Sequence, residues 1–222
     1  MSTPELTIAQ QVEALNGDLA SQMPPEVMGA FVDEIGSLST RAVPADVPAP
    51  GAPMPDGDLL DGHGEPTTFE VARDGKPAVV VFYRGAWCPY CNLTLRAYQQ
   101  QLVPALDERG VKLIAINPQK PDGSLTMQET NALTFTVLSD PGSVLMGKMG
   151  ILTEPGEGVQ EASAKLGLDI PGDAADGTWT MPMPTTAVVD AGGTIAWIDV
   201  HPVFATRSEP TEIIAAVDAL DD

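Results

Sequence analysis

The chain has 222 residues, with 11 Lys and Arg against 31 Asp and Glu, which gives a formal net charge of −20. This length is enough to bury a substantial core as one domain with an appendage. The charge excludes nucleic acid and anionic membranes as expected partners, because both are negatively charged. Two interpretations of the acidic surface stay open, ordinary solvation and adaptation to high salt.

The sequence also bears on the compartment. No apolar run is long enough to span a bilayer. Residues 1–22 lack the charged start and apolar centre of a signal peptide. Two neighbouring cysteines do not form the framework of a disulfide-stapled secreted protein. We therefore expect a cytoplasmic protein without a membrane partner.

The N-terminal quarter is expected to be helical. Thr3 is a candidate cap with Pro4 at the first helical position. Two apolar series at helical spacing follow, separated by Pro24-Pro25: Ile8, Val12, Leu15 and Leu19, then Val27, Phe31, Ile35 and Leu38. They predict a helical hairpin over residues 1–41, packed on the main domain or on a second subunit of a homo-oligomer. Residues 42–57, rich in Pro, Ala and Gly, predict an extended linker.

The remaining residues, 58–222, show the alternation of an α/β domain. Predicted strands cover 78–82, 111–117, 135–138, 185–190 and 194–200, and 58–64 with 67–71 suggest a short hairpin. Predicted helices cover 124–130, 141–149, 160–166 and 210–220. A further helix is predicted to start near Asn92 and to end at Pro104 or at Arg109-Gly110. Strand, helix, strand from 78 to 117 predicts a right-handed crossover between parallel strands. We therefore predict a central mixed sheet flanked by helices.

The chain is organised around residues 78–91. An apolar, β-branched strand is followed by a turn at Gly85-Ala86 and then by Cys88 and Cys91, the only cysteines of the chain. Pro89 falls at the first position of the helix that follows. A sulfur at a helix N-terminus faces the positive end of the dipole, which lowers its pKa. We expect Cys88 to be the exposed nucleophile and Cys91 to be a more buried resolving thiol, within reach of a disulfide.

A family resemblance rests on these residues. Trp87-Cys88-Pro89-Tyr90-Cys91 after an apolar strand resembles the thioredoxin superfamily, and its fold is the one implied. Residues 82–91, with Leu138-Ser139-Asp140-Pro141, resemble the peroxiredoxin-like branch grouped with alkyl hydroperoxide reductases, over roughly residues 58–220. Peroxiredoxins place a Pro and a Thr or Ser before the reactive Cys. Here Gly85 stands at the hydroxyl position, and no Pro precedes Cys88 in the loop.

Several supporting residues follow from this comparison and from position. The resemblance implies that Pro184, followed by Thr185, forms a cis peptide bond opposite the cysteines. Arg84 is expected either to stabilise a thiolate or polarise a peroxide, or to form a surface ion pair, and Arg207 ranks below it. Trp87 is expected to shield the sulfurs. Pro89 and Tyr90, between the cysteines, influence the reduction potential.

Three functions stay open at this point. The first is a thiol-dependent peroxidase that reduces hydrogen peroxide or organic hydroperoxides. The peroxide oxidises Cys88 to a sulfenic acid, Cys91 converts it to a disulfide, and a thioredoxin-like protein or a low-molecular-weight thiol restores both. The second is a thiol-disulfide oxidoreductase that acts on protein disulfides. The third is a non-catalytic thioredoxin-fold binding module. No cofactor is expected, and no metal, because zinc needs about four ligands and only His63 and His201 remain as soft partners.

Overall fold

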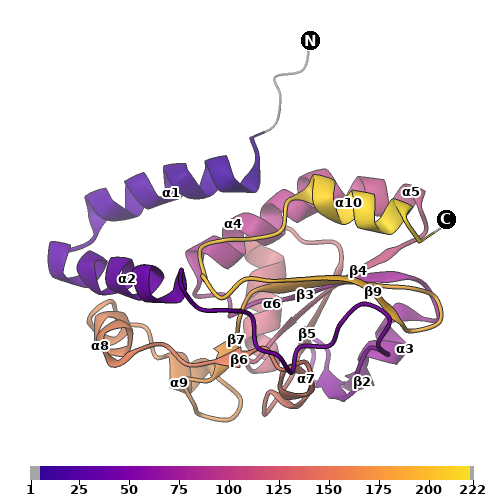
Figure 1. Ribbon diagram of the computed structural model, residues 1–222. Coiled ribbons are helices and arrows are strands. Elements are labelled where there is room, and N and C mark those ends of the chain that lie inside the picture. The colour runs from indigo at the N-terminus through magenta and orange to yellow at the C-terminus, as the bar shows by residue number, and fades with distance from the viewer. Residues whose placement is uncertain (1–5, 221–222) are drawn as a thin grey trace.

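The computed structural model describes residues 6–220, and a seven-stranded mixed sheet runs through its centre (Figure 1). The strand order is β2-β1-β5-β4-β3-β8-β9. These strands are β1 (Asp58–Leu60), β2 (Pro66–Thr68), β3 (Ala78–Phe82), β4 (Lys112–Asn117), β5 (Thr136–Ser139), β8 (Thr185–Val189) and β9 (Ile195–Val200). β3, β4 and β5 are parallel to one another, and the other pairings are antiparallel. The predicted central mixed sheet flanked by helices is confirmed.

Helices cover both faces of the sheet. They are α1 (Ile8–Gln22), α2 (Pro25–Leu38), α3 (Phe69–Arg73), α4 (Pro89–Ala97), α5 (Val103–Glu108), α6 (Pro121–Asn131), α7 (Val144–Lys148), α8 (Glu157–Lys165), α9 (Ile170–Asp173) and α10 (Pro210–Asp218). Two short strands, β6 (Leu152–Thr153) and β7 (Met181–Pro182), pair with each other outside the main sheet. No helix within residues 6–220 is long and apolar enough to cross a bilayer.

β3 lies near the middle of the sheet, and all five of its residues are buried. Val79 and Val81 belong to an apolar cluster that includes residues of α4 and α10, whereas Val80 and Phe82 belong to a second cluster that includes residues of α3 and α7. Successive side chains of a strand point to opposite faces, so burial on both faces requires the continuous apolar run that the sequence shows.

Three strand ends meet at the edge where the cysteines emerge. Phe82, the last residue of β3, pairs with Ile116 near the end of β4 and with Thr185 at the start of β8. In open α/β sheets, sites form beyond the carboxyl ends of the parallel strands. The turn from β3 to α4 therefore leaves the sheet beside residues that are about 100 positions later in the chain.

The N-terminal hairpin of α1 and α2 packs against the main domain, beside α4 in Figure 1. The side chain of Thr7 caps α1, whereas the predicted start at Thr3 and Pro4 lies outside the described residues. Ile8 and Ala9 donate their backbone N–H groups to the Glu209 carboxylate, at 2.9 Å each. A carboxylate at a helix N-terminus satisfies unpaired donors and complements the dipole, so Glu209 fixes the hairpin on the domain.

The segment between the hairpin and β1 follows the edge of the sheet. Gly51 N donates to Ile195 O, Met54 N donates to Gly193 O, and Ile195 N donates back to Ala52 O. β9 is the outer strand of the sheet, so its backbone groups would otherwise be free to pair with another chain. These hydrogen bonds satisfy part of them.

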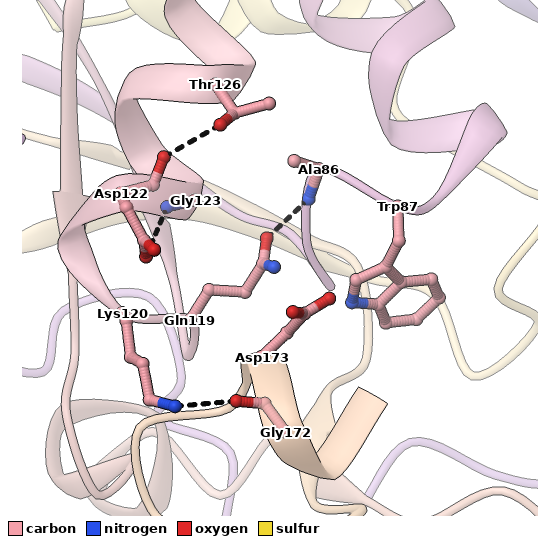
Figure 2. Close-up of a pocket in the computed structure, with 9 residues that line it drawn as sticks. All are labelled: Ala86, Trp87, Gln119, Lys120, Asp122, Gly123, Thr126, Gly172 and Asp173. Atoms are coloured by element: carbon pink, nitrogen blue, oxygen red, sulfur yellow. Dashed lines mark hydrogen bonds between the residues drawn. The ribbon is translucent and has the colours of Figure 1, made fainter. Parts of the chain in front are cut away.

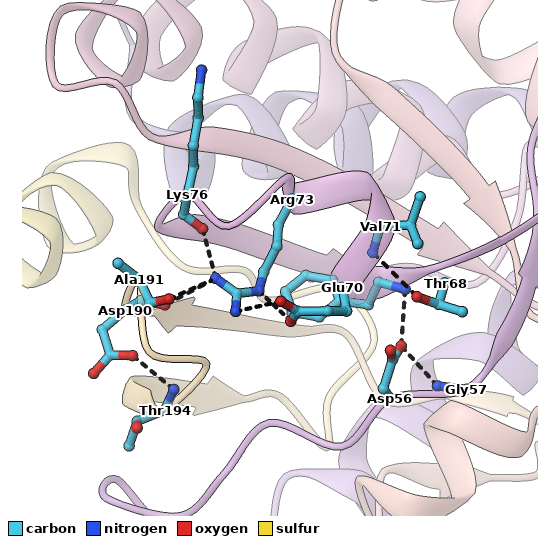
Figure 3. Close-up of polar contacts among 11 residues, drawn as sticks. Asp56, Gly57, Thr68, Glu70, Val71, Arg73, Lys76, Asp190, Ala191 and Thr194 are labelled. Atoms are coloured by element: carbon cyan, nitrogen blue, oxygen red, sulfur yellow. Dashed lines mark hydrogen bonds and ion pairs between the residues drawn. The ribbon is translucent and has the colours of Figure 1, made fainter.

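The strand predicted over residues 67–71 is wrong in part. Residues 66–68 pair with β1, but residues 69–73 form the helix α3 in place of the rest of a strand (Figure 3). The Thr68 hydroxyl accepts the N–H of Val71, and Asp56 Oδ1 accepts the N–H of Phe69. These side chains satisfy the first donors of the helix, which the pattern of apolar residues did not reveal.

Pro104 does not end the helix that follows the cysteines. A π-helical segment (Tyr98–Leu102) joins α4 to α5, and Pro104 lies in the first turn of α5. Proline is tolerated there because its missing N–H has no partner in that turn. The helical run ends at Glu108, so Arg109-Gly110 was the correct stop.

Candidate active site at the start of α4

The two cysteines occupy the first turn of α4. Cys88 is the N-cap residue with extended backbone angles (φ −85°, ψ 115°), and Pro89 takes the first helical position as predicted. The Asn92 side chain donates to the carbonyl oxygens of Ala86 (2.7 Å) and Cys88 (2.9 Å). A side chain of α4 itself therefore fixes the backbone of the turn that carries the cysteines.

Gly85 is required by this turn. Its φ of 154° is rare for residues with a side chain, and a Cβ there would lie 2.5 Å from Trp87 Nε1 and 2.8 Å from Gln119 Oε1. Gln119 also accepts the N–H of Ala86. Counting back from Cys88, the peroxiredoxin motif places a Thr or Ser at position 85. Either side chain would lie too close to Trp87 and Gln119 in this turn.

The prediction that Cys88 is exposed is wrong. Cys88 and Cys91 are both free thiols, and each is 1% exposed. The N-terminal hairpin explains the difference, because Leu19, Phe31 and Ile35 pack against the apolar cluster that contains both cysteines. The sequence pattern predicted these helices without indicating which surface they cover.

The prediction that the helix N-terminus lowers the pKa of Cys88 is wrong. Burial, followed by the hydrogen bond and charge of Cys91, raises the pKa of Cys88 well above its ordinary value. Burial also opposes ionisation of Cys91, but the hydrogen bond with Cys88 and the charges of Arg207 and Arg84 lower its pKa to about 5. Two adjacent thiols titrate as a pair, so the pair carries one negative charge near neutral pH.

Arg84 is a buried cation beside this pair. It is 7% exposed and forms none of the ion pairs found among residues 6–220, so the surface ion pair is excluded. Its guanidinium lies 5.1 Å from the centroid of the Trp87 ring and 4.7 Å from that of Phe204. Burial lowers the pKa of Arg84, while Cys88 and Cys91 raise it. Arg84 Nε donates to Met181 Sδ at 2.9 Å, and the charge of Glu34 adds a smaller contribution than those of the two cysteines. The buried cation therefore favours a thiolate in the cysteine pair.

Arg207 makes the direct contact with sulfur. Its Nη2 donates to Cys91 Sγ at 3.3 Å, and its Nη1 donates to the carbonyl oxygens of Phe204 and Thr206. The loop that carries Arg207 is held at His201, which bonds Asp199 Oδ2 at 2.8 Å and Thr206 Oγ1 at 2.9 Å. The sequence ranked Arg207 below Arg84 because nothing in the spacing brings residue 207 to residue 91.

The prediction of a cis bond at Pro184 is wrong, because the bond between Met183 and Pro184 is trans. Met183 N donates to Ile151 O at 2.8 Å and His201 N donates to Pro184 O at 2.9 Å, which ties the chain on either side of the bond. Thr185 is buried, and its hydroxyl donates to Met183 O. Pro184 lines a small cavity with Arg84, and neither cysteine lines it.

Two cavities share Trp87 as a wall. The first is an apolar cavity of about 70 Å³ between the hairpin, α8 and the cysteine turn, and Cys88 lines it. The second is a polar cleft of about 390 Å³, lined by Gln119, Lys120, Asp122 and Asp173 (Figure 2). Neither cysteine lines the larger cleft. The smaller cavity is therefore the one that belongs to the sulfur chemistry.

Three site residues were missed by the sequence analysis. Phe204 covers Arg84 and also packs on Tyr90, with ring centroids 5.8 Å apart. Gln119 supports the turn at Ala86. Asn16 accepts the hydroxyl of Tyr90 at 2.7 Å. These residues lie far from the cysteines in sequence and carry no motif, so no local signal could have identified them.

Comparison with known proteins identifies the family of this chain. The model of the AhpC/TSA family matches residues 50–198. Two Mycobacterium tuberculosis relatives, named provisionally as peroxiredoxins, are 29% identical over 116 residues, which cover 52% of this chain and 69% of theirs.

Solved structures share the fold. The peroxidoxin BcpB from Mycobacterium tuberculosis superposes with a TM-score of 0.59 at 18% identity, over 77% of this chain and 97% of that one. A peroxiredoxin-like protein from Aquifex aeolicus gives a TM-score of 0.61 at 15% identity, over 78% and 88% of the two chains. The match to the family model covers more than half of the chain, and a cysteine pair stands at the matched strand-to-helix turn. The chain belongs to the AhpC/TSA family as a peroxiredoxin-like member of the thioredoxin superfamily, which supports thiol peroxidase activity.

Proposed function

We propose that the protein is a thiol peroxidase in which peroxide oxidises Cys88 and Cys91 resolves the product. The observation that carries this proposal is the charge arrangement. Two buried thiols lie beside two guanidinium groups: Arg207 donates to Cys91 Sγ at 3.3 Å, and Arg84 lines the same cavity as Cys88. These cations lower the pKa of Cys91, which favours one thiolate in the pair. Preorganised cations of this kind stabilise the charge that develops as an O–O bond breaks.

We assign the attack to Cys88 for two reasons. Cys88 lines the apolar cavity, whereas Cys91 does not, so a substrate in that cavity meets Cys88 first. A thiolate of low pKa is also a weaker nucleophile, and Arg207 engages the sulfur of Cys91. Cys91 then serves as the base that takes the proton of Cys88, which leaves the stronger nucleophile at the cavity.

The reaction balances with the groups present. The Cys88 thiolate forms an S–O bond with the terminal oxygen of the peroxide, the O–O bond breaks, and the leaving oxygen takes a proton from the Cys91 thiol. The restored Cys91 thiolate attacks the Cys88 sulfenic acid, which forms the disulfide and releases hydroxide that is protonated to water. A low-molecular-weight thiol supplies the two electrons that restore both thiols, because it is small enough to reach the buried sulfurs.

Burial argues against the disulfide oxidoreductase. A mixed disulfide requires a partner's sulfur to reach Cys88 in line, and protein disulfides bring bulky chains with them. With Cys88 1% exposed beneath the hairpin, a small peroxide reaches the sulfur far more easily than a folded protein does.

The test is single-turnover oxidation of Cys88→Ser and Cys91→Ser followed by a dimedone-type probe. Cys91→Ser should consume about one peroxide per chain and be labelled at residue 88, because the sulfenic acid cannot be resolved. It should also react more slowly at neutral pH and faster as the pH rises, because its base is missing.

The result for Cys88→Ser decides the order of attack. We expect at least about 100-fold slower oxidation, the usual scale of losing a positioned catalytic group. Rapid labelling of Cys91 in that variant would show that Cys91 attacks. Slow oxidation of both variants, with rapid trapping of protein disulfides, would instead favour the oxidoreductase.

A further inference from the structure

A cluster of four polar side chains surrounds the loop that carries Arg207. The loop covers residues 201–209, between β9 and α10. His201 Nε2 lies 2.8 Å from Asp199 Oδ2, and Ser208 Oγ donates to the same oxygen at 2.8 Å. On the other side of the ring, His201 Nδ1 lies 2.9 Å from Thr206 Oγ1. The imidazole therefore connects β9 to the residues on both sides of Arg207.

The cluster is shielded from water and has one ionised acceptor. Ser208 is 1% exposed, and the buried Tyr98 donates its hydroxyl to Ser208 O at 2.7 Å. The hydrogen bond with His201, opposed by burial, lowers the pKa of Asp199, and Ser208 adds to the shift. An ionised carboxylate only accepts, so His201 Nε2 and Ser208 Oγ both donate to Asp199. Hydrogen bonds to a charged acceptor are stronger than neutral ones, which favours one conformation of the loop.

Arg207 depends on this loop for its position. It takes part in none of the ion pairs found among residues 6–220. Its guanidinium donates to the carbonyl oxygens of Phe204 and Thr206 and to Cys91 Sγ. Two of these three acceptors belong to the loop itself, and a long arginine side chain gains rotamer freedom when it is released. A loop that moves would therefore carry the cation away from the sulfur.

We propose that His201 and Asp199 are positioning residues, which hold the loop so that the Arg207 guanidinium stays on Cys91 Sγ. None of the four side chains of the cluster is hydrogen-bonded to a sulfur, so their effect passes through Arg207. In the function proposed above, this keeps Cys91 ionised as the base that takes the proton of Cys88, and the catalytic role of the cluster rests on that function.

The test is the ultraviolet absorbance of the thiolate in the reduced full-length chain, titrated against pH without peroxide. The other groups that act on Cys91 are Cys88 and Arg84, and neither belongs to the loop. His201→Gln should raise the apparent pKa of the cysteine pair by about 0.5–1 unit, because a facing opposite charge lowers a pKa by about 1–3 units and the variant weakens that contact. His63→Gln is the matched control, since His63 is the other histidine of the chain and is exposed; it should leave the titration unchanged.

Two variants of Asp199 separate position from charge. Asp199→Asn keeps an oxygen that accepts from His201 and Ser208 but removes the charge, so the cysteine pair should titrate nearly as in the unchanged chain. Asp199→Ala removes the acceptor and should match His201→Gln. Thr206→Val keeps the volume of an exposed side chain and removes one contact of the ring. It should raise the apparent pKa in the same direction, and it serves as the second variant if His201→Gln folds poorly.

A double-mutant cycle decides whether the effect passes through Arg207. Arg207→Gln should raise the apparent pKa by about one unit or more, and adding His201→Gln should then produce no further rise, because the positioned group is absent. Additive shifts would overturn the positioning role. So would a thiolate that titrates unchanged in both His201→Gln and Thr206→Val. A chain that no peroxide oxidises would refute the proposed function, whereas these titrations contain no peroxide and would stand apart from it.

Discussion

The polar cleft beside Gln119 holds about 390 Å³, whereas the apolar cavity that also uses Trp87 as a wall holds about 70 Å³. The cleft carries Lys120, Asp122 and Asp173 near its surface. The cavity carries a buried arginine and a sulfur. Charges that water surrounds are screened, whereas the same charge in a buried site acts strongly on its neighbour. The volume of a cavity therefore does not indicate which of the two is the reactive site. The burial of charged groups beside the sulfur is the better indicator.

The largest expected effect tests the buried charge of the cavity. Arg84→Met keeps a long apolar side chain between Trp87 and Phe204 but removes the cation. The rate of peroxide oxidation should fall about 100- to 1,000-fold, as for the loss of one preorganised electrostatic group. Stopped-flow Trp fluorescence measures it, because Trp87 adjoins Cys88. Arg84→Lys, which keeps a charge, should recover part of the rate; an Arg84→Met enzyme of normal rate would remove Arg84 from the site.

The second effect is the pH dependence of stability of the reduced protein. The pKa of Cys91 is lowered to about 5 in the folded chain, against about 8.5 for a free thiol. The unfolded chain therefore binds more protons between these values, so the free energy of unfolding should rise as the pH rises from 5 towards 8.5, by up to about 1.4 kcal/mol per pH unit. This stability is lost as the pH falls through 5.

Urea unfolding at several pH values measures this slope. Cys91→Ser should flatten it, because the thiol whose pKa differs between the folded and unfolded chain is then absent. A slope that survives in Cys91→Ser would place its origin outside the cysteine pair.

A smaller effect is expected at Pro184. Because its peptide bond is trans, Pro184→Ala does not require a change of isomer. The loss should be limited to the added freedom of the unfolded chain, about 0.4–1 kcal/mol of stability. Peroxide oxidation should stay within about three-fold, because neither cysteine lines the small cavity that Pro184 lines. Thermal unfolding and stopped-flow rates measure the two quantities. A loss of activity above ten-fold would give this residue a direct role.

The smallest effect belongs to the polar cleft. Burial, then the charges of Asp169 and Asp122, raises the pKa of Asp173, and Lys120 opposes the shift. Asp173→Asn should change the peroxide rate less than about two-fold, because exposed charges are screened and no sulfur lines the cleft. The same stopped-flow assay provides the measurement. A large loss would mean that the two cavities act together, and would contradict the comparison made above.

The sequence by itself determined the local parts of this protein. An apolar run, a turn glycine, Pro89 at the first helical position and three-residue cysteine spacing are sufficient to predict β3, the turn and α4, because their causes lie within 15 residues. The mixed sheet followed from the periodicity of the later segments. The apolar stripes of α1 and α2 likewise predicted two helices before any contact was known.

Only the tertiary structure decided the state of the sulfurs. The hairpin covers Cys88, Arg207 reaches Cys91 across 116 positions, and the chain on both sides of Pro184 is held by bonds to Ile151 and His201. A helix N-terminus lowers a thiol pKa in water, but burial and a neighbouring thiolate reverse that order for Cys88. Such terms depend on which distant residues pack together, and a pattern read along the chain does not contain that information.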